Sequence, residues 1–153
     1  MIKKALLVVS ALVVLLIAVG AMLYLRNAAP VVAPVSAAEA ANSGKPYVVK
    51  LHAQWCAVCL VTKDEWSQIE KMYAGRVNLL VLDFTTEANT QASRAEATRL
   101  GLGKFFDEYS GATGMIVVLD GRTKEVAASI VGNRDFVEYR DAIDATLKTA
   151  TSQ

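Results

Sequence analysis

The sequence predicts an α/β domain with three layers, in which a central mixed β-sheet is flanked by helices, preceded by one N-terminal transmembrane helix. Three observations lead to this prediction. From Tyr47 onward, short runs rich in β-branched residues alternate with helix-like segments, which is typical of parallel βαβ units. The last two of these runs are separated by the turn-like stretch DGRTK, which predicts an antiparallel hairpin. Residues 5–25 are uncharged and apolar.

This apolar run is long enough to cross a bilayer, because residues 5–25 as a helix would span about 31 Å. Lys3 and Lys4 precede the run and Arg26 follows it. The charge bias predicts a single-pass anchor, with residues 1–4 in the cytoplasm and everything after the run exported. A cleaved signal peptide is the alternative, since Val35-Ser36-Ala37 resembles a cleavage site. The uncleaved anchor is favoured, because the run is long for a signal peptide and ends well before that site.

Residues 26–44 form an Ala-rich and Pro-rich linker between the anchor and the folded domain. Pro30 and Pro34 keep its first half extended and semi-rigid. Residues 45–150 are then the folded domain. The formal net charge of the chain is only +1, and the sequence contains no basic stripe or RNA-binding motif, so nucleic acid is not expected as a partner.

The elements of the domain follow from periodicity and from breaking residues. Strands are predicted at residues 47–53, 77–85, 114–120 and 125–131. A helix is predicted over residues 56–74 and ends at Gly75, with one apolar face made of Val58, Val61, Glu65, Ile69 and Met72. Residues 89–109 are predicted to be mostly helical, with interruptions at Gly101 and Gly103. Asn133 is expected to cap a final helix that buries Phe136, Tyr139, Ile143 and Leu147.

Cys56 and Cys59 are the only cysteines, and they lie where the first strand passes into the first helix. Free N–H groups and the positive end of the helix dipole would stabilise a thiolate at Cys56 and lower its pKa. Cys59 lies one turn further in, so the outer thiol can attack a partner's disulfide and the inner thiol can resolve the mixed disulfide. A purely structural disulfide is the alternative, but so small a ring adds little stability. Leu60 follows Cys59, which does not indicate haem attachment.

The stretch VVKLHAQWCAVC, followed by a helix and VNLLVLDFT, resembles the thioredoxin superfamily, in which a tryptophan like Trp55 precedes the first cysteine. With the GKPYVV lead-in and the anchor, the chain looks most like membrane-anchored thioredoxin-like proteins, and the resemblance covers residues 45–150. It implies a thiol–disulfide oxidoreductase in which Cys56 is the nucleophile, Cys59 is the resolving thiol, and the two form a redox-active disulfide. No cofactor and no metal are implied.

The resemblance also implies partners and a location. The partners would be thiols and disulfides of exported proteins, with a transmembrane thiol reductase as electron donor. The location would be the inner (cytoplasmic) membrane, with the thioredoxin-like domain in the periplasm or an equivalent exported space.

Two departures from the family concern the surroundings of the cysteines. The family has a cis-proline loop facing the CxxC, whereas this chain has no proline after Pro46. Thr113 is expected in its place, or Gly114 if the alignment shifts by one residue. A cis bond before a residue other than proline costs about 3 kcal/mol, so the loop is expected to be trans. Thioredoxins also often carry a buried acid six residues before the first cysteine, where this chain has Lys50.

The role of Lys50 is open at this stage. Charged, it would favour thiolates; neutral, it could accept a proton; or it could extend to solvent without a redox role. His52 is expected on the same strand face as Lys50, where packing is favoured over catalysis. Ala57 and Val58 give Cys56 no side-chain hydrogen bond or charge, which favours a reductant or neutral exchanger.

Two other functions compete with the oxidoreductase. Cys56, Cys59 and His52 could bind Cu(I) or Zn(II) in a metal-handling module, because soft thiolates suit both ions. The domain could also be a non-catalytic tethered binding domain with an inert disulfide.

Overall fold

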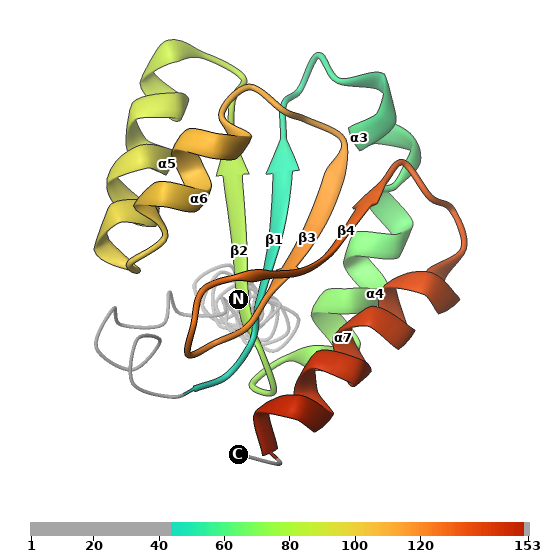
Figure 1. The fold of residues 1–153 in the computed structure, drawn as a ribbon. Coiled ribbons are helices and arrows are strands. Elements are labelled where there is room, and N and C mark those ends of the chain that lie inside the picture. The colour runs from blue at the N-terminus through green and yellow to red at the C-terminus, as the bar shows by residue number, and fades with distance from the viewer. Residues whose placement is uncertain (1–43, 152–153) are drawn as a thin grey trace, which may run out of the picture. The chain divides into compact units, whose positions relative to one another are not determined.

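The structure, a computed structural model, describes residues 44–151 (Figure 1). The predicted cytoplasmic end, the predicted anchor and residues 26–43 of the predicted linker lie outside the described residues. Within the described part of the chain, no helix is long and apolar enough to cross a membrane.

A mixed sheet of four strands forms the centre of the domain, in the order β2-β1-β3-β4. The strands are β1 (Tyr47–His52), β2 (Asn78–Asp83), β3 (Met115–Leu119) and β4 (Val126–Val131). β1 pairs with β2 in parallel and with β3 antiparallel, and β3 pairs antiparallel with β4. This confirms the mixed sheet and the predicted antiparallel hairpin of β3 and β4. Because β1 and β2 are parallel, the loops that follow His52 and Asp83 meet at one end of the sheet.

Helices cover both faces of the sheet, which gives the three predicted layers (Figure 1). On one face lie α5 (Glu87–Arg99) and α6 (Gly103–Tyr109), and on the other lie α4 (Lys63–Tyr73) and α7 (Phe136–Thr151). Along β1, Val49 and Leu51 belong to the core beneath α5 and α6, whereas Val48 belongs to the core beneath α4 and α7. Strand alternation therefore puts Lys50 and His52 on the α4/α7 face.

The predicted helix over residues 56–74 is two helices, α3 (Ala57–Val61) and α4, which are separated at Thr62. Thr62 has φ −103° and ψ 18°, and its backbone N–H and its hydroxyl both donate to the carbonyl of Val58, at 3.2 and 2.9 Å. The predicted apolar face was wrong in part, because the break changes which side faces the sheet. The exposed members are Val58, Val61 and Met72, and the buried side chains are Cys59, Thr62, Glu65, Trp66, Ile69 and Tyr73.

The start of α7 also differs from the prediction. Asp135, not Asn133, caps the helix, since its Oδ1 accepts from the N–H of Val137 at 2.9 Å. Asn133 supports this cap by accepting from the N–H of Asp135 at 2.8 Å. The predicted apolar face of α7 is confirmed, as is the interruption between α5 and α6.

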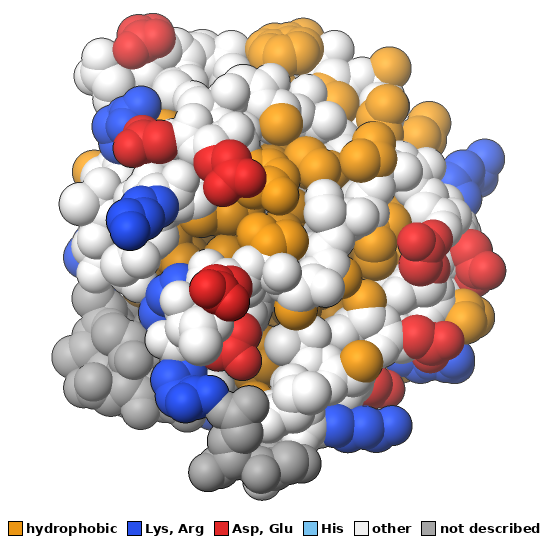
Figure 2. All heavy atoms as spheres, viewed as in Figure 1, with side chains coloured by type: hydrophobic (Ala, Val, Ile, Leu, Met, Phe, Trp, Pro, Cys, Tyr) orange, Lys and Arg blue, Asp and Glu red, His pale blue; other side chains and the backbone are white. Residues whose placement is uncertain are grey.

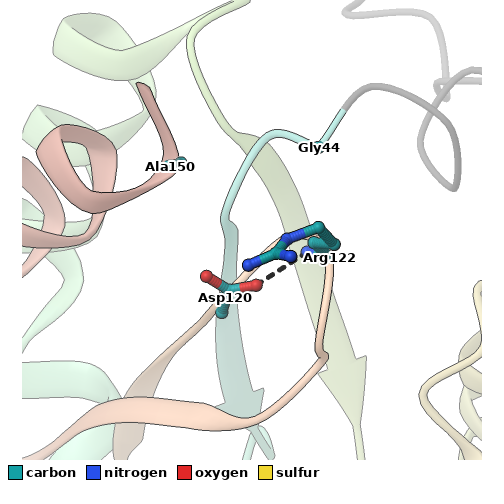
Figure 3. A pocket seen from close by; sticks show the side chains of 4 residues that line it. All are labelled: Gly44, Asp120, Arg122 and Ala150. Carbon is teal, nitrogen blue, oxygen red and sulfur yellow. Dashed lines mark hydrogen bonds between the residues drawn. The ribbon is translucent and has the colours of Figure 1, made fainter. Parts of the chain in front are cut away.

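A small pocket lies at the end of the sheet where β1 begins. Its lining residues are Gly44, Asp120, Arg122 and Ala150 (Figure 3). Oδ1 of Asp120 accepts from the backbone N–H of Arg122 at 2.8 Å. Because Tyr47 at the start of β1 pairs with Leu119, this pocket is at the opposite end of the sheet from Cys56.

Candidate active site

Cys56 is the N-cap residue of α3. Its backbone is extended, with φ −83° and ψ 108°, and its Sγ accepts from the N–H of Cys59 at 3.2 Å. Its own N–H donates to the carbonyl of Ala53 at 3.2 Å. Both thiols are free and buried, with Cys56 7% and Cys59 3% exposed. The sulfur of Cys56 thus lies at a helix N-terminus, where backbone N–H groups favour a thiolate.

The two thiols have pKa values displaced in opposite directions. Burial would raise the pKa of Cys56, but hydrogen bonds from the side chains of Cys59 and Thr113 and from the backbone of Cys59 and Val58 outweigh burial and lower it. Burial raises the pKa of Cys59, and the side-chain hydrogen bond with Cys56 raises it further. The Cys59 thiol also donates to the carbonyl of Leu51, at 3.7 Å. Cys56 is therefore the more acidic thiol and Cys59 the protonated partner.

The loop before β3 faces the CxxC through Gly114. The N–H of Gly114 donates to the carbonyl of Leu51 at 3.0 Å, and its φ is +79°. A Cβ at Gly114 would lie 3.3 Å from Sγ of Cys56 and 2.7 Å from Cβ of Val58. The backbone of Gly114 is thus directly opposite the CxxC, and the neighbouring Thr113 contributes a side-chain hydrogen bond to Cys56. All peptide bonds among the described residues are trans.

Val58 lies between two glycines. Besides Gly114, it adjoins Gly132 at the end of β4, where a Cβ would lie 2.9 Å from Cγ1 of Val58. The N–H of Gly132 donates to the carbonyl of Gly114 at 3.0 Å, which links the two glycine positions. Ala57 is exposed and makes no such contact. Sequence reasoning missed Gly132, for which the only signal was a glycine directly after a strand.

Trp55 is held by the loop that follows β2. Its Nε1 donates to the carbonyl of Thr85 at 3.3 Å, although the side chain is 65% exposed. The N–H of the preceding Gln54 donates to Oγ1 of Thr85 at 3.0 Å. The Thr85 hydroxyl donates to Oδ1 of Asp83, and Nδ2 of Asn89 donates to Oδ2 at 2.6 Å. Asp83 therefore organises the loop that supports the tryptophan.

This network lowers the pKa of Asp83. Burial would raise that pKa, but the hydrogen bonds from Thr85 and Asn89, together with the nearby His52, outweigh burial. Neither Asp83 nor Thr85 could be predicted as part of the site, because the contacts of Thr85 with Gln54 and Trp55 join residues about thirty positions apart.

Lys50 and His52 lie on the α4/α7 face of β1, as predicted, but only Lys50 shares a cavity with a cysteine. Lys50 lines a small cavity together with Cys59, and its Nζ is 5.5 Å from the ring centroid of Trp66. Burial lowers the pKa of Lys50, and attraction to Cys59, Glu70 and Cys56 in their ionised forms opposes that effect. His52 is partly buried opposite Asp83, and its Nδ1 has no hydrogen-bond partner among the described residues.

The metal-handling alternative lacks a ligand set. Within residues 44–151, no three His, Cys, Asp or Glu side chains come close enough together to hold a metal ion. His52 does not join Cys56 and Cys59 in such a group.

The surface around the cysteines is apolar and uncharged. Residues 53–62 include no charged side chain. Exposed hydrophobic side chains at this end of the domain are Trp55, Val58, Leu60, Val61 and Val131. Figure 2 shows hydrophobic side chains at the upper right of the domain, where Figure 1 places α3, and further ones across the middle of this face.

Residues 35–99 match the family model of thioredoxin. Over 45 residues the chain is 40% identical to the chloroplastic thioredoxin-like protein HCF164 of Oryza sativa subsp. japonica, and the same holds for HCF164 of Arabidopsis thaliana. Each match covers 29% of this chain and only 17% of the relative's length.

Solved structures with a similar fold include thioredoxin-family proteins. The thiol:disulfide interchange protein of Chlorobium tepidum TLS is 22% identical with a TM-score of 0.47, over 71% of this chain and 84% of that one. The oxidised thioredoxin O2 of Arabidopsis thaliana is 17% identical with a TM-score of 0.45, over 72% and 82%. The residues that match the thioredoxin model include Cys56-x-x-Cys59, so the resemblance to thioredoxins covers the site described above.

Proposed function

We propose that this protein is a membrane-tethered thiol–disulfide oxidoreductase that reduces or exchanges disulfides of exported proteins. The observation that carries the proposal is the asymmetry of the two thiols. Cys56 caps α3, and hydrogen bonds there lower its pKa, whereas Cys59 is more deeply buried and its pKa is raised. A nucleophile and a resolving thiol require this difference.

The reaction follows in two exchanges. The Cys56 thiolate attacks one sulfur of the partner's disulfide, forms a mixed disulfide and releases the first partner thiolate. Cys59 then loses its proton and attacks Sγ of Cys56, which releases the second partner thiolate. Two electrons pass to the partner, whose two sulfurs are reduced to thiols on taking up protons, and Cys56 and Cys59 end as a disulfide.

The apolar rim around the CxxC suits a partner that presents an uncharged segment beside its disulfide. Contacts of this kind depend on buried apolar area rather than on charge pairing, so docking should depend weakly on salt. Each cycle leaves Cys56 and Cys59 oxidised, and we propose that a transmembrane thiol reductase restores them.

The proposed location is the inner membrane, with the N-terminus in the cytoplasm and the domain in the periplasm or an equivalent exported space. The uncharged run over residues 5–25 and the lysines before it support this orientation. An exported compartment also contains the protein disulfides on which such a domain would act.

The test is reduction of a disulfide-bonded protein, such as insulin, by the full-length chain in detergent. We expect turnover by the wild type and none by Cys56→Ser. The reduction potential against glutathione then fixes the direction of electron flow. A value near that of thioredoxin, about −270 mV, would support a reductant, and one near the strong oxidants, about −120 mV, would reverse the assignment.

A further inference from the structure

A lysine side chain lines the small cavity beside Cys59. Lys50 and Cys59 both line it, together with Thr62, Ile116 and Tyr139. Lys50 reaches it from β1 and Cys59 from α3, on the side of the sheet that α4 and α7 cover. The lysine therefore approaches the resolving cysteine from within the domain rather than from the partner's side.

Lys50 is held in this position by a buried aromatic ring. Its Nζ lies 5.5 Å from the ring centroid of Trp66, a side chain that is only 7% exposed. Nε1 of Trp66 donates to Oε1 of Glu70 at 2.7 Å, which fixes the ring. A cation over an indole ring is stabilised without being neutralised, so the charge of Lys50 remains available to a neighbouring group.

The titratable groups around Lys50 come from three elements. Cys59 exerts the largest electrostatic effect on it, followed by Glu70 and Cys56, which all attract the ammonium, while Lys63 on α4 repels it. Tyr139 of α7 lines the cavity, and its hydroxyl donates to the carbonyl of Asn133 at 2.8 Å. Burial raises the pKa of Tyr139, and the charge of the buried Glu65 of α4 also raises it.

We propose that the ammonium of Lys50 stabilises the Cys59 thiolate and thereby accelerates the resolving step. The proposal rests on the oxidoreductase function proposed above and assigns Lys50 to one of its two exchanges. In that step the S–H bond of Cys59 breaks and its proton goes to water. The Cys59 sulfur bonds to Sγ of Cys56, the bond from Cys56 to the partner breaks, and the partner's thiolate leaves. Lys50 keeps its proton throughout.

The resolving step is where such a charge is needed. Burial raises the pKa of Cys59, which opposes formation of the nucleophile. Once the mixed disulfide has formed, the sulfur of Cys56 is neutral, and Lys50 is the cation that lines the cavity with Cys59. An opposite charge close to a thiolate favours the ionised form.

The test is the pH dependence of Cys59 alkylation in the full-length Cys56→Ser chain, where Cys59 is the only thiol. We expect Lys50→Met, which keeps an apolar stem against Trp66, to slow alkylation at pH 7 by up to about tenfold and to move the profile to higher pH. Lys50→Arg, which keeps the charge, should retain most of the wild-type rate. Lys71→Met removes an exposed lysine from the last turn of α4 and should leave the profile unchanged.

An unchanged profile in Lys50→Met would overturn the proposal, as would equal slowing by Lys50→Met and Lys50→Arg or by Lys50→Met and Lys71→Met. Thermal unfolding of each variant identifies any loss of fold, and Lys50→Gln, which also removes the charge, replaces Lys50→Met if that variant does not fold. Because alkylation requires no partner, this result is independent of the insulin assay. Failure of wild-type turnover would overturn the proposed function, whereas failure of the alkylation shift would overturn only the role of Lys50.

Discussion

At the scale of single residues, the site depends on how differently two nearby cysteines are surrounded. Sγ of Cys56 accepts a backbone N–H at the start of α3, whereas Sγ of Cys59 donates to the carbonyl of Leu51. The same short helix therefore favours a thiolate at its first position and a protonated thiol one turn later. This asymmetry is what makes an ordered, two-step exchange possible.

The first prediction concerns the order in which the thiols react. Because the pKa of Cys56 is lowered and that of Cys59 is raised, mild alkylation at low pH should label Cys56 first. Cys56→Ser should abolish exchange, and Cys59→Ser should accumulate mixed disulfides with partners. Peptide mass mapping after brief alkylation checks the order, and labelling of Cys59 first would show that the roles are reversed.

The second prediction concerns the hydroxyl of Thr113. Its hydrogen bond to Cys56 helps to lower the pKa of that thiol. Thr113→Val is nearly isosteric but removes the donor, so the Cys56 thiolate should be less populated and exchange at pH 7 slower by up to about tenfold. Thr113→Ser keeps a hydroxyl and is the matched control. Equal rates for the valine and serine variants would show that the hydroxyl has no influence.

Residue-level prediction from the sequence worked where local spacing carries the chemistry. The position of Cys56 and Cys59 at a helix N-terminus follows from a strand-like run, a WCxxC and a helix-like run in succession. Thr85 and Gly132 could not be found in this way. Their contacts with Trp55 and Val58 join separate elements, and neither residue type is unusual where it stands.

At the scale of elements, α3, the loop before β3 and the end of β4 pack closely together at the CxxC. α3 places Val58 against the loop before β3 and against the end of β4, and glycine stands at both of those positions. A residue with a Cβ at either position would have to displace Val58, and its backbone would be held at an unfavourable positive φ. The small residues therefore keep α3 close to the sheet.

The third prediction tests this contact at Gly132. Gly132→Ala should destabilise the fold by about 1–3 kcal/mol, since a Cβ would lie 2.9 Å from Cγ1 of Val58 and φ is +59°. Val58→Ala removes that Cγ1, so the double variant should recover the steric part and keep the backbone part. Thermal unfolding of the four chains measures the coupling. Strictly additive effects would show that Val58 and Gly132 do not press on one another.

The fourth prediction concerns Asp83 and the loop after β2. Asp83→Ala should destabilise the fold by about 1–3 kcal/mol at pH 7, because it leaves the donors of Thr85 and Asn89 without their acceptor. The folded pKa of Asp83 is lowered, so its stabilising effect is present above the pKa of an unfolded aspartate and is lost as pH falls through the folded value.

The difference between wild type and Asp83→Ala should therefore be complete at neutral pH and shrink below about pH 4. Thermal unfolding across this pH range is the measurement. Asp107→Ala serves as the control, because its ion pair with Arg94 is exposed on both sides and contributes little. A difference that stays constant down to pH 2 would rule out the carboxylate as its source.

Most elements were predictable, and the exceptions share a cause. The four strands and the α5/α6 interruption follow from β-branched runs and from glycine. The break between α3 and α4 was missed because threonine is an ordinary helix residue. Here its backbone leaves the helical region, with φ −103° and ψ 18°, and its hydroxyl bonds back to the carbonyl of Val58, a contact that often bends helices. The cap of α7 was misplaced by two residues because Asn133 and Asp135 both accept backbone N–H groups.

At the scale of the whole molecule, the domain and the segment before it have opposite characters. The described domain buries its apolar residues in two cores on either side of one sheet, and several exposed apolar side chains, such as Trp55, Val58 and Leu60, lie around the CxxC. Residues 5–25 are uncharged and almost entirely apolar, so their sequence has no polar face of the kind that a surface helix presents to water. The anchor proposed for residues 5–25 would hold the CxxC close to a membrane surface.

The last prediction tests that tether. Because residues 5–25 are uncharged and long enough to span a bilayer, the protein should fractionate with membranes and resist extraction by high salt or alkaline carbonate. Replacing Val14 and Leu15 with Asp should release it, since each carboxylate at mid-span costs about 3 kcal/mol of insertion free energy. Val81→Asp, at an exposed position on β2, is the control that adds charge without changing residues 5–25.

The intact mass of the extracted protein decides between an uncleaved anchor and a cleaved signal peptide. A mature chain that begins near Ala38 would show cleavage after Val35-Ser36-Ala37, and the domain would then act without a tether.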